Sequence, residues 1–258
     1  MAKSKSDYWI KFLGTAGARF VMIRQLRSSG GLWIQADDTR VLVDPGPGSL
    51  VRCSSSRPKL DPTTLNAIIL THRHLDHAND INVMIEAMTE GGFKKRGVVF
   101  VPQDALDPEN YVIFRYAREF PGKIEILKPH QAYAAGNFSF ETSGELKHPC
   151  QTYGLKFKMK ETRVSILSDT EYFEGLAEMF ACDLLIVNVV FFEPRPGIQH
   201  LNLGDIKKLI ARMEPKKTIL THFGMTMLKA HPHELARQLS WETGLDVEAA
   251  RDGMKLEF

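Results

Sequence analysis

The chain reads Thr71-His72-Arg73-His74-Leu75-Asp76-His77 directly after the apolar run Ala67-Ile68-Ile69-Leu70. The apolar run predicts a buried strand, and the histidine-rich segment that follows (residues 71–77) predicts a loop. Alternate side chains of an extended backbone point to the same side, so His72 and His74 can face one ion. Asp76 and His77 follow around the turn and can reach a second ion. Because neutral imidazoles and carboxylates bind divalent metals, this segment predicts half of a two-metal site.

The other half of such a site requires donors from elsewhere in the chain. Three candidates stand where a predicted strand gives way to a loop, which is where α/β proteins gather their functional residues. They are His148, Asp169 and His222. One such residue alone is more often structural, but its combination with the histidine-rich segment reverses that preference. Zinc is the first candidate metal, and manganese or iron is also compatible with these donors. The histidines without such a context, expected at the surface or at helix caps, are His130, His231 and His233.

Three motifs of the chain resemble the metallo-β-lactamase superfamily of dinuclear metallohydrolases, and the resemblance extends over nearly the whole length. They lie at residues 12–17, 41–46 and 71–77. The resemblance implies an α/β fold, a four-layer αββα sandwich of metallo-β-lactamase type, formed by residues 1–258 as a single domain. It also implies that one metal ion is held by His72, His74 and His148, that the other is held by Asp76, His77 and His222, and that Asp169 bridges them.

Within the superfamily, the chain is most similar to the phosphodiesterase branch, which includes ribonuclease Z and the cyclic phosphodiesterase of the carbon-phosphorus lyase pathway. His200 stands where this branch has a histidine beside the scissile phosphate. The alternative is that His200 caps the following helix, although Asn202 or Asp205 could supply that cap. Ribonuclease Z carries a long tRNA-gripping arm between the positions that match His148 and Asp169, whereas residues 152–164 here predict a plain hairpin. The resemblance therefore favours a small or cyclic nucleotide-type phosphodiester as substrate.

The implied reaction is hydrolysis by a hydroxide that bridges two divalent metal ions. Asp76 would orient this nucleophile and accept its proton, and His200 would stabilise the transition state or protonate the leaving oxygen. Asp44 and Thr71 are candidates for orienting the ligand imidazoles. A hydrolase of a thioester, lactone or lactam stays open as a second hypothesis. A metal-binding partner protein without turnover is the third.

Composition restricts the class of protein further. With 258 residues and 43% hydrophobic content, the chain suits one globular domain. No apolar run approaches the roughly 20 residues of a membrane span, and the polar residues 1–6 contain no signal-peptide segment. We therefore expect no membrane partner and a cytoplasmic location. The cysteines, expected to be free thiols with Cys150 as a small buried filler, are Cys53, Cys150 and Cys182.

Charge says little about partners. A net charge of +2 gives no general attraction for nucleic acid, so a long nucleic acid partner is not indicated. The arginines after the first predicted strand could hold a phosphate or could be solvated loop residues; they are Arg19, Arg24 and Arg27. A homodimer is an expectation from the resemblance alone.

Apolar periodicity predicts the order of the elements. Strands are expected at residues 9–14, 32–36, 40–44, 67–70 and 98–101, and around positions 124, 132, 138, 153, 164, 184 and 218. A short helix is expected before residue 67, and further helices at residues 78–89, 108–119, 172–180, 203–213 and 233–243. The apolar stripe at residues 184–190 is expected to be a buried strand without chemistry. Residues 191–197 predict a loop that could overhang the site.

Overall fold

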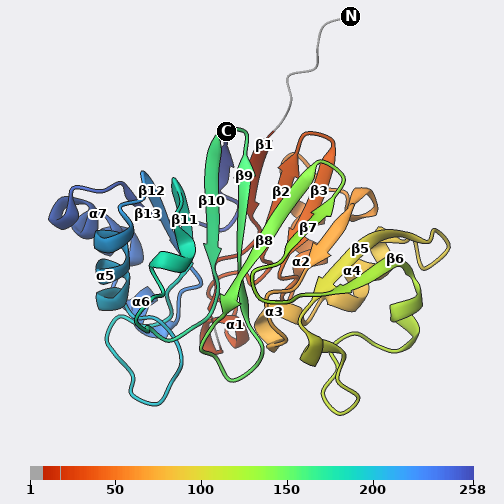
Figure 1. Ribbon diagram of the computed structural model, residues 1–258, viewed down its shortest axis with the longest axis horizontal. Coiled ribbons are helices and arrows are strands. Elements are labelled where there is room, and N and C mark those ends of the chain that lie inside the picture. The colour runs from red at the N-terminus through yellow and green to blue at the C-terminus, as the bar shows by residue number, and fades with distance from the viewer. Residues whose placement is uncertain (1–7, 18) are drawn as a thin grey trace, which may run out of the picture.

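The computed structural model describes residues 8–17 and 19–258. Two seven-stranded sheets lie face to face, and helices cover the outer side of each (Figure 1). This is the four-layer αββα sandwich that the sequence predicts, so the predicted fold class is confirmed. Residues 1–6, on which part of the expected location depends, lie outside the described ranges.

The first sheet has the strand order β14-β1-β2-β3-β4-β5-β6. Its strands are β1 (Tyr8–Phe12), β2 (Leu32–Ala36), β3 (Thr39–Val43), β4 (Ala67–Ile69), β5 (Arg96–Val101), β6 (Pro121–Ile126) and β14 (Lys255–Glu257). From β3 to β6 neighbouring strands run parallel. β4 is buried along its whole length, and the histidine-rich segment follows its carboxyl end. β14, which pairs with β1, has no counterpart among the predicted strands.

The second sheet has the order β13-β12-β11-β10-β9-β8-β7. Its strands are β7 (Ala132–Ala135), β8 (Phe138–Glu145), β9 (Tyr153–Met159), β10 (Thr162–Leu167), β11 (Leu184–Asn188), β12 (Lys217–Thr221) and β13 (Val247–Ala249). β9 and β10 form the predicted hairpin, with Met159 opposite Thr162. The described interval between His148 and Asp169 thus contains this hairpin and no protruding arm.

Apolar side chains from both sheets fill the space between them, among them Phe12, Ile34, Phe138 and Ile166. Outside the first sheet lie α2 (Ser49–Ser55) and α4 (Ile81–Met88), and outside the second lie α5 (Leu203–Met213) and α7 (Pro232–Thr243). Because central strands are covered on both faces, they read as continuous apolar runs. The shorter helical elements are α1 (Phe20–Ile23), α3 (Leu75–Ala78), α6 (Met225–Lys229), η1 (Pro62–Thr64) and η2 (Gln103–Leu106). Across the described residues, no helix is both long and apolar enough to pass through a bilayer.

The helix predicted at residues 108–119 is wrong, because only the 3₁₀ turn η3 (Tyr116–Glu119) forms there. The Asn82 side chain donates to the carbonyl oxygen of Val112 and accepts from the amide of Phe114. These tertiary hydrogen bonds replace the backbone bonds of a helix, so the segment follows the edge of the fold as a loop.

The helix predicted at residues 172–180 is also wrong, since only the 3₁₀ turn η4 (Glu178–Phe180) is present. Gly175 has a φ of 91°, which is outside the helical region and interrupts any helix through it. The predicted helix at residues 78–89 begins later than expected: α3 comes first, and α4 starts at Ile81.

The carboxyl ends of the parallel strands in both sheets meet at one edge of the molecule, beside α1 and α3 at the bottom of Figure 1. At this edge the loop after β1 is hydrogen-bonded to the loop after β12. The amide of Phe223 donates to the carbonyl oxygen of Thr15, and the amide of Gly17 donates to that of Phe223. Donors that are distant in the sequence therefore share one edge.

Candidate metal centre

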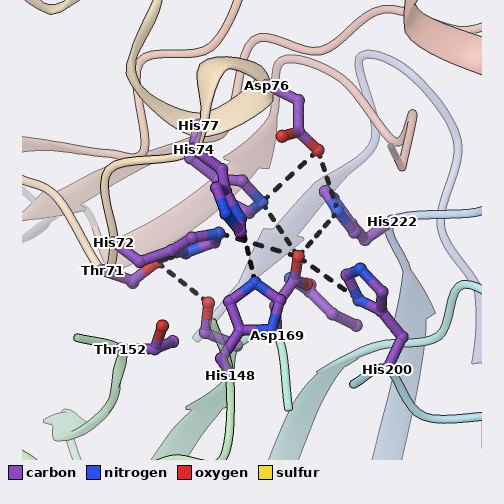
Figure 2. A network of polar contacts seen from close by, with 12 residues as sticks. Thr71, His72, His74, Asp76, His77, His148, Thr152, Asp169, His200 and His222 are labelled. Atoms are coloured by element: carbon purple, nitrogen blue, oxygen red, sulfur yellow. Dashed lines mark hydrogen bonds and ion pairs between the residues drawn. The ribbon is translucent and has the colours of Figure 1, made fainter. Parts of the chain in front are cut away.

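The backbone of the histidine-rich segment changes from extended to helical along its length. His74 is extended, with φ of −62° and ψ of 149°, and is the N-cap residue of α3. Asp76 and His77 therefore lie in a short helix; the ring of His77 stays next to that of His72, with centroids 4.0 Å apart, while Asp76 faces His222 (Figure 2). All residues predicted as metal ligands converge on this place, and they divide into two neighbouring groups.

The first group, called here the histidine group, consists of His72, His74 and His148. His148 Nε2 lies 2.9 Å from His74 Nδ1. The other ring nitrogen of His148, Nδ1, donates to the carbonyl oxygen of Gln199 at 3.0 Å, so Nε2 presents a lone pair. Two ring nitrogens this close must share a proton or a cation between them.

Thr71 fixes the ring of His72. Its hydroxyl donates to Asp44 Oδ2 at 2.8 Å, because a carboxylate can only accept, and it therefore receives a hydrogen bond from His72 Nδ1 at 3.1 Å. Ser168, which directly follows β10 of the second sheet, contacts the same hydroxyl at 2.9 Å. His72 Nε2 is consequently left to face the centre, as expected for a ligand held by an orienting neighbour.

The second group, called here the acidic group, consists of Asp76, His77, Asp169 and His222. His222 Nε2 lies 3.3 Å from Asp76 Oδ2 and 3.4 Å from Asp169 Oδ2. His77 Nε2 lies 3.4 Å from Asp169 Oδ2, while its Nδ1 donates to Asp44 Oδ2 at 2.9 Å. Asp44 and Thr71 thus hold the imidazoles in the way that was predicted for them.

Asp169 connects the two groups through a single oxygen. Its Oδ2 lies 3.7 Å from His72 Nε2 in the histidine group and 3.4 Å from His77 Nε2 in the acidic group. Its other oxygen, Oδ1, accepts a hydrogen bond of 2.8 Å from Asn188 Nδ2. The sequence analysis missed Asn188, which ends β11 and lies within the stripe of residues 184–190 that was expected to carry no chemistry. Its position at the carboxyl end of a buried parallel strand, like that of Asp169, was the available signal.

Five donor atoms that converge here are buried and make no hydrogen bond. They are His72 Nε2, Asp76 Oδ2, His77 Nε2, His200 Nδ1 and His222 Nε2. Buried polar atoms are almost always satisfied, so such a cluster of nitrogen and carboxylate donors is suited to a positively charged partner. The residues present fit divalent metal ions.

The two groups differ in their electrostatics. Burial, with His77 nearby, lowers the pKa of His72 well below its ordinary value. Burial also lowers the pKa of His148 to about 4, although the Asp169 carboxylate opposes the shift. For His222 burial acts in the same direction, but Asp169 and Asp76 outweigh it and raise the pKa to about 9. The histidine group is thus neutral and ready to bind a metal at neutral pH, whereas the acidic group retains a proton until a cation replaces it.

His200 lies beside both groups, with Nδ1 3.6 Å from Asp169 Oδ2 and its ring 5.1 Å from that of His148. It does not cap α5, because Asn202 is the N-cap residue and forms a capping box with Asp205. Burial lowers the pKa of His200, so its ring is neutral at physiological pH. The alternative role as a helix cap is therefore wrong.

Of the other candidate residues, Cys150 lies next to the histidine group. Cys150 is buried, as predicted, and its Sγ lies 3.8 Å from His74 Nε2, the nitrogen that faces away from His148. Arg19 and Arg24 are exposed near α1, and Arg27 Nη1 donates to Thr15 Oγ1 at 3.4 Å. Their phosphate-binding role stays a prediction.

Comparison with known proteins identifies the family. The model of the beta-lactamase superfamily domain matches residues 39–223. The uncharacterized protein MJ1374 of Methanocaldococcus jannaschii is 31% identical over 96% of this chain and 94% of its own length. The probable metallo-hydrolase YhfI of Bacillus subtilis is 28% identical over 77% of this chain and 82% of its own.

Solved structures share the fold. The crystal structure of YhfI from Bacillus subtilis, described as a metallo-beta-lactamase fold protein, has a TM-score of 0.80 at 20% identity, covering 98% of this chain and 100% of that one. A diphosphatase of the PhnP family has a TM-score of 0.72 at 21% identity, covering 97% of both chains. The short form of human tRNase Z has 0.68 at 17%, covering 96% of this chain and 98% of that one. The chain therefore belongs to the beta-lactamase superfamily and is a metallo-hydrolase of this fold, as its motifs predicted.

Proposed function

We propose that the protein is a metal-dependent phosphodiesterase that hydrolyses a small or cyclic nucleotide-type phosphodiester. The observation that carries the proposal is His200, whose Nδ1 lies 3.6 Å from Asp169 Oδ2 and which takes no part in capping α5. Hydrolysis of a thioester, lactone or lactam does not require a histidine at this place. Two proteins with a similar fold, the PhnP-family diphosphatase and human tRNase Z, are named for the cleavage of phosphate linkages, which supports the same class of reaction.

The metal ions would be held by the two groups described above. The histidine group would hold one ion, and Asp76, His77 and His222 would hold the other, with Asp169 Oδ2 shared between them. Zinc is the first candidate, with manganese or iron as alternatives. When bound, two divalent ions lower the pKa of water toward neutrality and polarise a phosphoryl oxygen.

The side chains of the centre would transfer protons during the reaction and keep the metal-binding atoms in position. Asp76 Oδ2, buried and without a hydrogen-bond partner, would accept the proton of the attacking water. His200 would donate a hydrogen bond or a proton to an oxygen of the phosphate, because its neutral ring carries one N–H. Asp44, Thr71 and Asn188 would keep the donors at the centre in position through the hydrogen bonds described above.

Turnover of bis(p-nitrophenyl) phosphate tests the proposal. Metal-stripped protein is reconstituted with Zn²⁺ or Mn²⁺ and measured beside His200→Ala, with His130→Ala as the matched control because His130 is exposed and outside the centre. We expect diester cleavage that falls about 10²- to 10⁴-fold in His200→Ala, the range for loss of general acid–base catalysis, and that persists in His130→Ala.

The same preparation is assayed with nitrocefin and with a thioester. Cleavage of either one without any diester turnover would contradict the proposal and support the second hypothesis. Stoichiometric metal binding without cleavage of any of these substrates would favour a non-catalytic metal-binding protein.

A further inference from the structure

His148 lies in the loop that joins β8 to β9 of the second sheet. Directly before it, the amide of Lys147 donates to Thr170 Oγ1 at 3.1 Å, and the carbonyl oxygen of Lys147 accepts from the amide of Glu171 at 3.0 Å. Both partners belong to the segment that follows β10, so these bonds attach the loop to its own sheet. They do not set its distance from His74, which follows β4 of the first sheet.

Contacts to the first sheet come three residues after His148, at Gln151. Its amide donates to Asp104 Oδ2 at 3.1 Å, and the amide of Asp104 donates back to Gln151 Oε1 at 3.1 Å. Asp104 lies in η2, which follows β5 of the first sheet. The same Asp104 Oδ2 accepts from Arg73 Nε at 3.0 Å, and Arg73 stands between His72 and His74 in the histidine-rich segment. Asp104 thus connects the loop of His148 with that segment.

The connection is made by one oxygen in a partly buried place. Asp104 Oδ1 is buried and forms no hydrogen bond with any described residue, so Oδ2 alone receives both donors. The side chains of Arg73 and Asp104 are 31% and 22% exposed, so their attraction is screened less than that of a fully exposed pair. Beside it, the amide of Tyr153 donates to the carbonyl oxygen of Thr71 at 3.1 Å. The two segments are therefore joined by one backbone bond and by the contacts of Asp104.

We propose that Asp104 is a positioning residue of the metal centre, which holds His148 at the distance from His74 at which both rings can bind one ion. This inference rests on the two-metal centre of the proposed function and not on the identity of the substrate. The facing nitrogens, His148 Nε2 and His74 Nδ1, are 2.9 Å apart. Without the Asp104 carboxylate the loop loses its side-chain attachment to Arg73, so binding of the ion must also order the loop, which lowers affinity.

Titration of metal-stripped protein with Co²⁺ tests the inference, because the visible absorption of bound Co²⁺ depends on its ligands. Wild type should show two binding steps, and the step that His148→Ala removes belongs to the histidine group. In Asp104→Ala we expect the Kd of this step to rise about 10- to 100-fold, the range for residues that orient metal ligands. The other step, at the acidic group, should change by less than about 3-fold.

Asp183→Ala is the matched control. Asp183 Oδ2 accepts from Arg163 Nε at 3.0 Å and from the amide of Arg163 at 2.9 Å, so it receives the same two kinds of donor as Asp104 Oδ2. Asp183 precedes β11 and therefore lies at the opposite edge of the second sheet from the metal centre. Because this variant loses an equivalent ion pair far from the donors, both Co²⁺ steps should stay within about 3-fold of wild type.

Two further substitutions separate positioning from a general loss of stability. Asp104→Asn keeps an oxygen that can accept from Gln151 but loses the charge, so the Kd of the histidine-group step should rise by only about 3- to 10-fold. This variant also serves if Asp104→Ala does not fold. Arg73→Ala should weaken the same step. Combined with Asp104→Ala it should add less than the product of the two single effects, because both act through one contact.

The possible results distinguish this inference from the proposed function. Equal weakening of both steps in Asp104→Ala, or binding like wild type in both Asp104→Ala and Asp104→Asn, would overturn the inference and leave the two-metal centre in place. Fewer than two Co²⁺ ions bound by wild type would contradict the two-metal centre and the inference with it. Since no substrate enters the titration, failure of the diester assay alone would count against the phosphodiesterase proposal only.

Discussion

The histidine group and the acidic group are neighbours, yet their donor side chains are oriented and kept in their protonation states by different interactions. In the histidine group, imidazoles are oriented by neutral partners, the Thr71 hydroxyl and the Gln199 carbonyl, and burial keeps them unprotonated. In the acidic group, carboxylates face the imidazoles directly and Asp44 orients His77. The difference indicates that one half of the centre is organised by burial and the other by charge, with Asp169 as the shared element.

The largest effect is expected from removing that shared element. Asp169→Ala deletes the carboxylate oxygen that faces both groups, so both should lose metal affinity together. We expect activity to fall by more than about 10³-fold and metal content to fall below one ion per chain, measured by mass spectrometry of the metals in protein whose folding is verified by circular dichroism. His148→Ala should affect the histidine group selectively. A variant of Asp169 that retains two ions would show that the groups are independent.

A smaller effect is expected from Asn188→Leu, which removes the hydrogen bond to Asp169 Oδ1 and leaves the ligands themselves in place. With Asp169 free to rotate, we expect metal affinity to fall about 10- to 100-fold, as for other residues that orient ligands. Competition with a chromogenic chelator measures this affinity, and Asn110→Leu, at an exposed position, is the control. Unchanged affinity would mean that the carboxylate is positioned without Asn188.

The two groups should also contribute differently to the pH dependence of the folding stability of the metal-free protein. His148, with a pKa of about 4, stays neutral in the folded chain while its unfolded form takes up a proton near its ordinary pKa of 6.5, so stability falls as pH drops from about 6.5 to 4. His222, with a pKa of about 9, keeps its proton in the folded chain, so its contribution is present below 6.5 and is lost as pH rises through 9.

Denaturant unfolding of the metal-free protein across this range measures both effects. We expect His148→Gln to reduce the loss of stability between about pH 6.5 and 4, and His222→Gln to reduce the loss of stability as pH rises through about 9. If both substitutions altered the same limb, the electrostatic contrast between the groups would be wrong.

The smallest effect is expected from Cys150→Ser. Cys150 Sγ lies 3.8 Å from His74 Nε2, and a serine hydroxyl can accept the same hydrogen bond. Metal affinity should change by less than about 3-fold. Cys150→Val, which cannot accept, should weaken the histidine group more than Cys150→Ser does, and equal effects would make Cys150 the plain filler that the sequence suggested.

The candidate metal ligands could be found from the sequence because each stands at a recognisable place along the chain. The histidine-rich segment could be interpreted from the sequence because its donors lie in one loop after a buried strand. His148, Asp169 and His222 could be found because strand ends are a recurrent place for function. Asn188 was missed although it also ends a buried strand, because its partner Asp169 follows the neighbouring strand, 19 residues away, and only strand pairing brings the two together.

The sequence by itself determined the family, the order of most strands and the chemical type of the centre, because apolar periodicity and short motifs are local properties of the chain. Tertiary structure decided which nitrogen of each imidazole faces inward, which oxygen of Asp169 is shared, and that Asn202 rather than His200 caps α5. It also replaced the expected helix at residues 108–119 with a loop held by Asn82. These features depend on hydrogen bonds between distant segments, and local periodicity carries no information about them.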